Sequence, residues 1–478
     1  MVHVLRAGGG PRGRRGGDPR ERRAWGRGGG PDRRRVAERV LPLARPARRR
    51  GEEPAVSLWC WLWPRGDRRI LAAYLVLIVF SLALLWSVTE PLTGPYAKMR
   101  VDVPKAIFWR QVVWVVLAWI AIGVVSRFSL NDLENVSWPA YLGVCALLVA
   151  VLGLGPEVAG ARRWLVLGNL RLQPSEFAKV AMVILMASWL GRRAEDGSRM
   201  TATLGSLVLA LVPAILVLRE PDLGTSLVFL AIWLGMIFWY GISGLLLLTA
   251  ISSAASAVIM FYSDRILEQP WPWAVYLLAT MGVLYLVRAG LAASGLVLGA
   301  NIGAGLGIPL VWSRLQPYQQ ERILSFFEPS KNEYGTAYQA IQSKVAIGSG
   351  GLFGTHYLQG TQKGLAFLPE RHSDFIFSVA GEELGLLGAG TMLVVFGLLV
   401  LRAIDVATEV RRPFASLLAV GIASYFTFHV VVNVSITTGL LPVTGLPLPL
   451  ISYGGSNLLT SSLMVGLLLN LSVHRYDD

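Results

Sequence analysis

The sequence predicts an all-α protein whose helices cross a membrane many times. Of its 478 residues, 54% are hydrophobic, and the mean hydropathy is +0.53. Apolar runs close to the length of a bilayer crossing recur along the chain, and a hydrocarbon core about 30 Å thick takes about 20 helical residues. Because these runs are unbroken and do not alternate with polar residues, they favour helices and exclude a transmembrane β-barrel.

Twelve segments are expected to span the membrane. They are residues 70–89, 106–126, 137–155, 175–192, 200–218, 223–241, 243–262, 271–288, 290–312, 375–401, 414–438 and 456–473. Lys and Arg in short loops favour the cytoplasmic side of a membrane. The Arg-rich N-terminal region and the basic loops at 191–199 and 401–413 therefore predict that both chain termini are cytoplasmic.

Residues 1–69 are predicted to be a disordered cytoplasmic leader, followed by a transmembrane domain over 70–478. The leader holds 19 Arg, no Lys and seven Asp or Glu, so +12 of the chain's net charge of +14 lies there. Its Arg-, Gly- and Pro-rich composition cannot bury a core, and the first long apolar run comes too late for a signal peptide. RGG-like pieces could bind RNA or anionic lipid. A solvated tail or an over-long start is the simpler explanation, so we expect no specific nucleic-acid partner.

One connection is much longer than the others. About sixty residues, 313–374, separate two predicted spans, and loops of that length are usually functional or disordered. The stretches ERILSFFEP and YGTAYQAIQSKVAIG are typical of short amphipathic helices, with Ala337, Ile341 and Val345 spaced for one face. We therefore expect a structured extracytoplasmic loop that acts as a lid.

Ionisable residues lie inside or at the ends of the apolar spans, where each is costly and therefore a functional candidate. The decapeptide LPERHSDFIF places Glu370, Arg371, His372 and Asp374 directly before an apolar run. Further candidates are Arg110, Arg162, Arg163, Trp164, Arg171, Glu176, Lys179, Glu220, Asp222, Glu382 and Glu383. The segment LPLPLISYGGSN, which begins at Leu446, leads into the last span and is interrupted by Pro and Gly.

In the predicted orientation, most of these groups lie at the extracytoplasmic ends of the spans. Glu176, Lys179, Asp222 and Asp374 all fall on that side. Taken singly, they have simpler explanations: Glu176 and Lys179 could form a satisfied ion pair, and Trp164 could be an interfacial anchor. Their convergence on one face favours a functional site.

Five motifs occur along the chain in this order: GARRW…QPSEFAK, EPDLGT, QSKVAIGSGGLFG, GTQKGLAFLPERHSDFIFSVAGEELGLLG and LPLPLISYGGSN. Together they resemble the SEDS family of cell-shape, division and sporulation proteins, over about residues 70–473. GTQ before FLPERH, with Arg371 after Glu370, is more similar to the elongation member RodA than to the division member FtsW. The family fold implies ten membrane helices, so two of the twelve spans would be an extra pair, within about 243–288.

The resemblance implies a peptidoglycan glycosyltransferase in the bacterial inner (plasma) membrane that polymerises lipid II into glycan strands on the outer face. It would serve cell elongation and cell-shape maintenance. The family works with a class B penicillin-binding protein, a transpeptidase that cross-links the new glycan. The family's essential acidic residue corresponds to Asp374, and Arg110 matches a family arginine. By motif match, the family's cavity residues correspond to Arg163, Glu176, Lys179 and Asp222.

The chemistry that this function requires gives each candidate a role. A single inverting displacement would join the 4-hydroxyl of one GlcNAc to C1 of a lipid-linked MurNAc and release undecaprenyl pyrophosphate. Asp374 is the candidate base, because desolvation at a helix start raises the pKa of a carboxylate toward the working range. His372 is the alternative base.

The pyrophosphate that leaves needs positive charge beside it. The candidates for that charge are Arg163, Arg110 and Lys179, followed by Lys344 and Arg371. Glu176 and Asp222 could hold those cations or help to bind a divalent cation such as Mg²⁺ or Mn²⁺. We also count Trp164, Glu370 and His372 among the substrate-binding residues.

Two other function classes remain open at this stage. In a lipid II flippase, broken starts such as EPDLG and LPLPLIS would correspond to the discontinuous helices of transporters. However, the charges favour one face, and the two halves show no inverted repeat. A catalytically inert scaffold would explain the spans but would leave the charges of the large loop unused. A division or sporulation role is the alternative to elongation.

Overall fold

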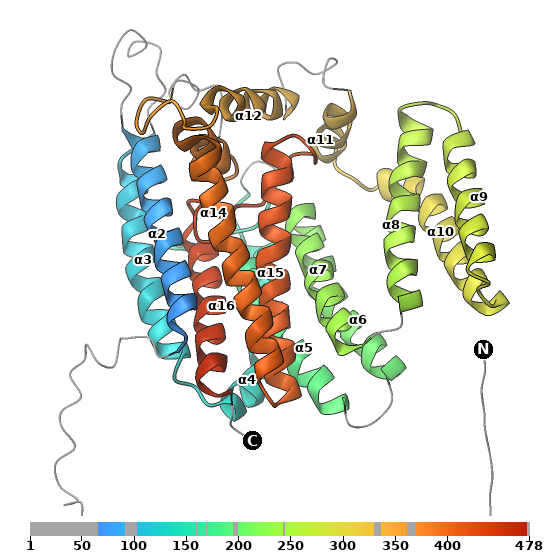
Figure 1. Ribbon diagram of the computed structural model, residues 1–478, viewed down its shortest axis with the longest axis horizontal. Coiled ribbons are helices and arrows are strands. Elements are labelled where there is room, and N and C mark those ends of the chain that lie inside the picture. Colours follow the sequence, from blue (N-terminus) through green and yellow to red (C-terminus); the bar gives the residue numbers. More distant parts are fainter. Residues whose placement is uncertain are drawn as a thin grey trace, which may run out of the picture. The chain divides into compact units, whose positions relative to one another are not determined.

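The computed structural model describes residues 66–90, 103–157, 161–168, 170–194, 199–241, 244–328, 336–360 and 370–475 (Figure 1). These described residues all belong to one compact unit. The predicted leader lies outside the described residues, except for its last four. The elements are α2 (Arg68–Thr89), α3 (Ala106–Val125), α4 (Leu130–Leu154), β1 (Leu165–Leu167), β2 (Leu170–Leu172), α5 (Pro174–Arg193), α6 (Arg199–Arg219), α7 (Leu223–Tyr240), α8 (Gly244–Arg265), α9 (Trp271–Leu286), α10 (Leu291–Trp312), α11 (Pro317–Phe327), α12 (Thr336–Gly350), α14 (Ile376–Glu409), α15 (Pro413–Thr437) and α16 (Gly455–Val473).

Each of the twelve segments predicted to cross the membrane corresponds to a long helix. Ten of the described helices are long and apolar enough to span a membrane. The other two are α5, which carries charged residues at both ends, and α9, which has only 16 residues. The all-α membrane fold is therefore confirmed, whereas the number of crossings stays a prediction.

The interior of the bundle is formed mainly by α5, α15 and α16, most of whose residues are buried. In the most apolar stretches of α15 and α16, 67% and 83% of the residues are buried, compared with 22% in α3 and in α4. Because a membrane helix can be apolar on all sides, its amphipathicity does not reveal which face is inside. Here polar side chains mark the interior instead, since Asn433, Ser461 and Asn470 are all fully buried.

Local sequence signals explain where several helices begin. Ser129 and Asp132 form a capping box at the start of α4. Pro174 and Pro413 stand in the first turns of α5 and α15, where a missing N–H costs nothing. Between α4 and α5 the chain forms a short antiparallel hairpin of β1 and β2, with a turn at Gly168.

Helices α8, α9 and α10 pack on one another through a small polar cluster. Asn301 Nδ2 donates to Ser252 Oγ at 2.9 Å, and the Tyr276 hydroxyl donates to Ser252 O at 2.7 Å and to Asn301 Oδ1 at 3.1 Å. Two of these helices, α8 and α9, lie within the region 243–288, to which the sequence assigns an extra pair of spans.

The long loop contains the two helices that its sequence predicts, α11 and α12. Figure 1 shows α12 lying across the end of α14. Ser343 of α12 is within 2.6 Å of Ser378 Oγ and donates to Thr437 O at 2.6 Å, which fastens the helix to α14 and α15. Ile341 and Val345, which the spacing places on one apolar face, are 40% and 45% exposed. A small polar side chain, and not that face, makes this contact with the bundle.

The glycine-rich stretch after α12 meets a break in α14. At Gly385 the backbone leaves the helical region, with φ 66° and ψ −168°. The Leu386 amide donates to Gly351 O, and the Thr355 amide donates to Glu382 O, each at 2.9 Å. The stretch thus satisfies backbone groups that the broken helix leaves unpaired.

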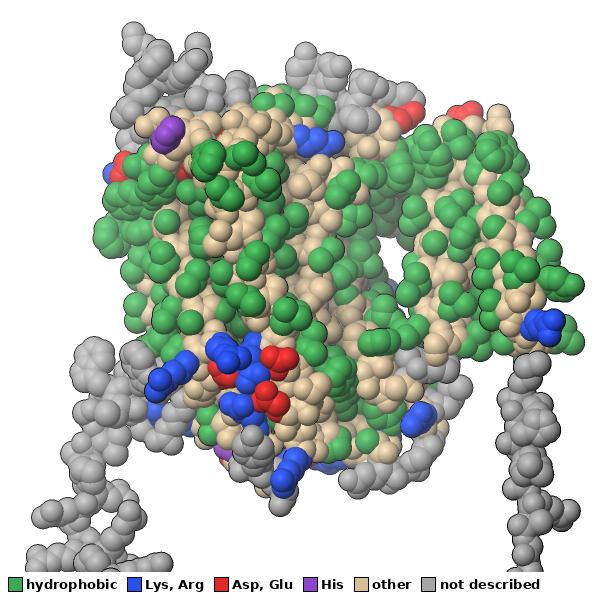
Figure 2. All heavy atoms as spheres, viewed as in Figure 1, with side chains coloured by type: hydrophobic (Ala, Val, Ile, Leu, Met, Phe, Trp, Pro, Cys, Tyr) green, Lys and Arg blue, Asp and Glu red, His purple; other side chains and the backbone are tan. Residues whose placement is uncertain are grey.

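The surface of the bundle is apolar along the helices and carries charged side chains near both ends. Figure 2 shows hydrophobic side chains over most of this face and a charged group near the ends of α14 and α16. There Arg402 donates to Asp67 at 2.7 Å, and Arg402 and Arg475 pair with Glu409 at 2.8 and 2.7 Å. Asp374 lies at the other end of α14, just before its first residue.

Candidate active site

Asp374 lies in a tight turn directly before α14. The backbone amides of Ser373 and Asp374 both donate to the Glu370 carbonyl at 3.1 Å, and Glu370 has a positive φ of 53°. The turn therefore holds the carboxylate outside the helix, where it is half-buried. The next residues, Phe375 and Ile376, are fully buried and exclude water from one side of it.

The Asp374 side chain faces the segment between α15 and α16, and Arg322 lies beside it. A methyl group on Gly445 in that segment would be 3.4 Å from Asp374 Oδ2 and 3.9 Å from Arg322 Nη1. Gly445 has a φ of +77°, which favours glycine. Arg322 belongs to α11, so the long loop supplies a cation next to the carboxylate.

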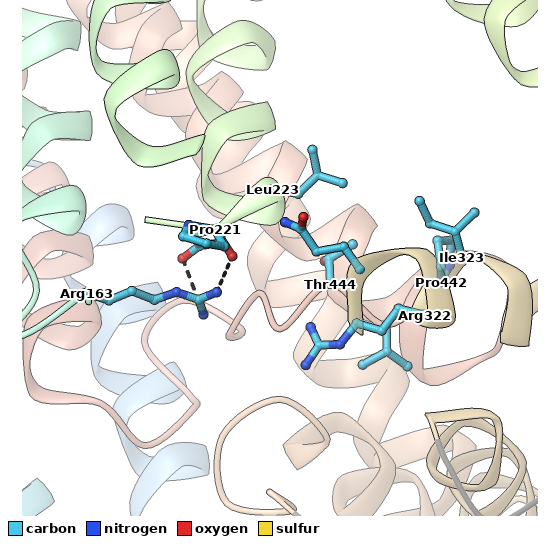
Figure 3. A pocket seen from close by; sticks show the side chains of 10 residues that line it. Arg163, Pro221, Leu223, Arg322, Ile323, Pro442 and Thr444 are labelled. Atoms are coloured by element: carbon cyan, nitrogen blue, oxygen red, sulfur yellow. Dashed lines mark hydrogen bonds and ion pairs between the residues drawn. The ribbon is translucent and has the colours of Figure 1, made fainter. Parts of the chain in front are cut away.

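A pocket opens beside Asp374 and Arg322 (Figure 3). Its lining residues are Arg163, Pro221, Asp222, Leu223, Gln319, Arg322, Ile323, Pro442, Val443 and Thr444. They come from the chain before β1, the α6–α7 turn, α11 and the segment after α15. Figure 3 shows Arg163 and Arg322 reaching toward the pocket from opposite sides. With two arginines against one carboxylate, the lining favours an anionic ligand.

Arg163 is anchored by the turn between α6 and α7. Its Nε donates to Glu220 O at 3.0 Å, and a second guanidinium nitrogen donates to Pro221 O. A third nitrogen lies 4.0 Å from Asp222 Oδ2. Backbone carbonyls thus fix the direction of this arginine, and its charge remains at the edge of the pocket.

Asp222 lines the pocket and also begins α7. Its carboxylate accepts from the Thr225 amide at 3.1 Å and from Thr225 Oγ1 at 3.0 Å, as an N-cap does. The neighbouring Glu220 is fully buried, and neither of its carboxyl oxygens has a hydrogen-bond partner among the described residues. Burial, and then the Asp222 charge, raise the pKa of Glu220 to about 8 against the opposing effect of Arg163.

The surroundings of Asp374 raise the pKa of its carboxyl group toward the neutral range. Burial, and then the Glu370 carboxylate, raise this pKa to about 6 against the opposing effect of Arg322. A base works best when its pKa lies near the operating pH, because it is then both ionised and able to take a proton. The carboxylate therefore has the electrostatic setting of a general base.

Glu176 and Lys179 form a separate group inside the bundle, which we call the buried cluster together with Tyr425 and His429. Lys179 Nζ donates to Glu176 Oε1 at 2.8 Å, and both side chains are almost completely buried. The same ammonium is 3.3 Å from His429 Nε2 and 5.6 Å from the centre of the Tyr425 ring. His429 Nδ1 is 3.3 Å from the carbonyl of Pro447. The pair predicted from the i, i+3 spacing is present, but it does not line the pocket.

The remaining sequence candidates lie around the pocket or away from it. Arg110 and Lys344 are exposed and do not line it, and Trp164 is half-buried next to Arg163. His372 Nε2 is 3.7 Å from Glu370 Oε2, within the turn that carries Asp374. Burial lowers the pKa of His372, and the Glu370 carboxylate opposes this shift.

Sequence reasoning did not single out Arg322. It lies in ERILSFFEP, which the hydrophobic spacing identifies only as a short amphipathic helix. A signal was present, because this arginine belongs to a loop that ends at the polar decapeptide. The spacing could not tell which of the loop's charged residues would face the pocket.

The described residues supply no ready set of metal ligands. No group of three or more His, Cys, Asp or Glu side chains in this part of the chain could hold a metal ion. Asp222, one of the predicted ligands, already accepts two hydrogen bonds within its own helix start. A site for Mg²⁺ or Mn²⁺ thus stays a prediction, and we assign it no step.

The helical bundle, the break in α14 and a polar pocket under a long loop define a multi-pass membrane protein with a site at one end of its helices. The chain belongs to the family described as "Cell cycle protein", whose model, FTSW_RODA_SPOVE, matches residues 68–273 and 266–477. The two matched parts overlap at residues 266–273, and the extra pair of spans within 243–288 stays a prediction.

Curated relatives carry the names of both the elongation and the division branch. The chain is 32% identical over 412 residues to "Peptidoglycan glycosyltransferase MrdB" of Escherichia coli K12, which covers 86% of this chain and 94% of the relative. It is 32% identical over 399 residues to "Peptidoglycan glycosyltransferase RodA" of Treponema pallidum, and this match covers 77% of this chain and 90% of that relative. It is 34% identical over 367 residues to "Probable peptidoglycan glycosyltransferase FtsW" of Trichlorobacter lovleyi, and this match covers 76% of this chain and 82% of that relative.

Solved structures share the fold. The rod shape determining protein RodA of Thermus thermophilus is 25% identical, with a TM-score of 0.55 over 87% of this chain and 99% of that one. A chain from the structure "Structural coordination of polymerization and crosslinking by a peptidoglycan synthase complex" is 28% identical, with a TM-score of 0.59 over 87% of this chain and all of that one.

Proposed function

We propose that this protein is a peptidoglycan glycosyltransferase that polymerises lipid II into glycan strands for cell elongation and cell-shape maintenance. Relatives named for that activity match the chain over most of its length. The observation that carries the proposal is the placement of Asp374 beside Arg322, an arginine that lines a pocket together with Arg163. Asp374 does not itself line this pocket, but a base next to two cations that do supplies the groups that the reaction needs.

In the proposed reaction Asp374 is the general base. The 4-hydroxyl oxygen of a GlcNAc attacks C1 of the lipid-linked MurNAc, and its proton passes to the Asp374 carboxylate. The bond between C1 and the pyrophosphate oxygen breaks, and the electron pair leaves with undecaprenyl pyrophosphate. A single displacement turns an α-linked donor into a β-1,4 bond.

Arg322 and Arg163 are the proposed partners of the leaving pyrophosphate. They approach the pocket from opposite sides, so that one guanidinium can contact each side of a diphosphate (Figure 3). Because the guanidinium of Arg163 already donates to two carbonyls, its direction needs no rearrangement when the charge develops. Lys179 would contribute only at a distance, as a buried charge.

The protein is proposed to lie in the inner membrane, with both termini in the cytoplasm and the pocket on the outer side. The partner is expected to be a class B penicillin-binding protein, since one structural relative comes from a complex that coordinates polymerisation and cross-linking. Surrounding lipids would cover the apolar helix surfaces seen in Figure 2.

Replacement of the base tests the proposal. Asp374→Asn should lower the rate of polymerisation of fluorescent lipid II by about 10²–10⁴-fold, the usual contribution of a general base. Asp264→Asn at the exposed end of α8, which does not line the pocket, is the control and should keep the parent rate. Normal glycan strands from Asp374→Asn would refute the assignment. The parent protein, reconstituted with lipid II, separates the alternatives. If it transfers lipid II between leaflets but makes no polymer, it is a flippase. If it does neither, it is a scaffold.

A further inference from the structure

Three consecutive backbone carbonyls in the turn that carries Asp374 accept hydrogen bonds from outside the turn. The carbonyl of His372 accepts from the Tyr453 amide at 2.9 Å. The carbonyl of Ser373 accepts from Ser452 Oγ at 2.5 Å. That of Asp374 itself accepts from Asn433 Nδ2 at 3.0 Å. All three donors come from α15 or from the segment between α15 and α16.

The Asp374 carbonyl is held by a side chain and not by its own helix. In the first turn of α14 the amides of Ser378 and Val379 both donate to Phe375 O, at 3.0 and 3.4 Å. The helix therefore makes its first hydrogen bonds one residue after Asp374. The donor that fixes the peptide group of Asp374 is Asn433.

Asn433 also holds the facing wall of the site. The same Nδ2 donates to Leu446 O at 2.8 Å, and Asn433 is completely buried. Leu446 follows Gly445, the residue that lies against the Asp374 carboxylate. One amide group thus bridges the turn that carries the base and the segment that the base faces.

The chemistry of the amide fits this bridging position. Both partners are carbonyl oxygens, so the position needs two N–H donors, which an asparagine amide supplies and a carboxylate does not. Asn433 Oδ1 has no hydrogen-bond partner among the described residues although it is buried. The amide is therefore held by its donors alone, and its loss would leave two buried carbonyls without this donor.

We infer that Asn433 is a positioning residue for the reaction, which sets the distance between the Asp374 carboxylate and the Gly445–Leu446 wall. This inference rests on the proposed function, because it assigns Asn433 an effect on the step in which Asp374 accepts the proton. Asn433 itself touches neither the pocket nor the reacting atoms.

The chain contains a matched control, Asn470, in the last turn of α16. Asn470 is also completely buried, and its Nδ2 also bridges two carbonyls, those of Val125 at 3.1 Å and Phe128 at 2.6 Å. Its Oδ1 is likewise without a partner among the described residues. Asn433 and Asn470 thus have the same local chemistry, and only Asn433 contacts the turn that carries Asp374.

The test compares Asn433→Leu with Asn470→Leu in the full-length protein. Both variants should lose a similar amount of thermal stability, because each removes two side-chain hydrogen bonds to backbone carbonyls. Only Asn433→Leu should lower the kcat of lipid II polymerisation, by about 10²-fold, since a small displacement of a catalytic group has an effect of that size. Its KM should stay within about twofold of the parent value, because the arginines that line the pocket are unchanged.

Equal kcat values for the two Leu variants would overturn the inference. If Asn433→Leu does not fold, Ser452→Ala is measured instead. It removes the donor to the Ser373 carbonyl together with the acceptor of the Leu448 amide, and a fall in kcat at unchanged KM again supports positioning of the turn. Asp374→Asn, measured in parallel, separates this inference from the proposed function. Full activity of that variant refutes the base itself, whereas an inactive Asp374→Asn with equal Leu variants refutes only the role of Asn433.

Discussion

Two groups of charged residues at the same end of the helices differ in what surrounds them. In the buried cluster, Lys179 donates to Glu176 and lies within hydrogen-bond distance of His429, and the side chains of both ion-pair partners are at most 3% exposed. At the pocket, Asp374 and Arg322 lie beside an opening that other polar side chains line. Both groups contact the segment between α15 and α16, the first at Pro447 and the second at Gly445.

This difference separates residues that can stabilise the protein from residues that can react. A charge that is buried and paired loses its partner only at a large cost in stability, because the other charge is left unpaired in a poor solvent. A charge beside an opening can exchange its contacts for those of a ligand. The same residue types therefore predict different consequences of mutation in the two places.

The largest effect on stability is expected in the buried cluster. Lys179→Met leaves the Glu176 carboxylate buried without its ion pair, and the free energy of unfolding should fall by about 3–5 kcal/mol. Thermal unfolding in detergent measures this loss. The double variant Glu176→Gln/Lys179→Met removes both charges and should recover most of it. A single variant as stable as the parent would show that the pair does not support the fold.

The largest effect on activity without loss of stability is expected at Arg322. Arg322→Gln should lower kcat for lipid II polymerisation by about 10²-fold, the size of effect seen when one donor to a developing negative charge is removed. Arg314→Gln, which removes an exposed charge from the same loop outside the pocket, should leave the rate unchanged. If the two variants have equal rates, Arg322 does not act on the leaving group.

Gly445 allows backbone strain to be separated from contact with the base. An alanine at its φ of +77° should cost about 1–2 kcal/mol of stability. Gly241→Ala, at a φ of +89° and with open space around it, should cost the same. Only the Gly445 variant also places a methyl group against Asp374 Oδ2, so only it should slow polymerisation. Equal activity of the two variants would contradict the placement of the carboxylate.

The pH dependence of polymerisation gives the smallest and most specific effect. Since the pKa of Asp374 is about 6, the rate should rise with pH through that value as the base ionises. Arg322 lowers this pKa, so Arg322→Gln should move the midpoint to higher pH, by about one unit. Glu370→Gln removes a neighbouring anion that raises the pKa and should move the midpoint to lower pH. Rate profiles with the same midpoint in all three proteins would exclude Asp374 as the titrating group.

The sequence by itself determined the helices. Every apolar run long enough to cross a membrane forms one, because in lipid a backbone must satisfy its own hydrogen bonds. It also identified Asp374 as a carboxylate outside the start of α14, and the pairing of Glu176 with Lys179, since both follow from positions close together in the chain. Even the two helices of the long loop could be predicted from local spacing.

Only the tertiary structure decided which charged side chains lie close together. Arg322 and Asp374 are 52 residues apart, and Asn433 reaches the Asp374 carbonyl across 59 residues. Whether an arginine lines the pocket, as Arg163 and Arg322 do, or is exposed outside it, as Arg314 is, depends on how elements far apart in the chain pack. Hydropathy is nearly uniform around a membrane helix, so it gives the length of each helix but not the direction in which its polar side chains point.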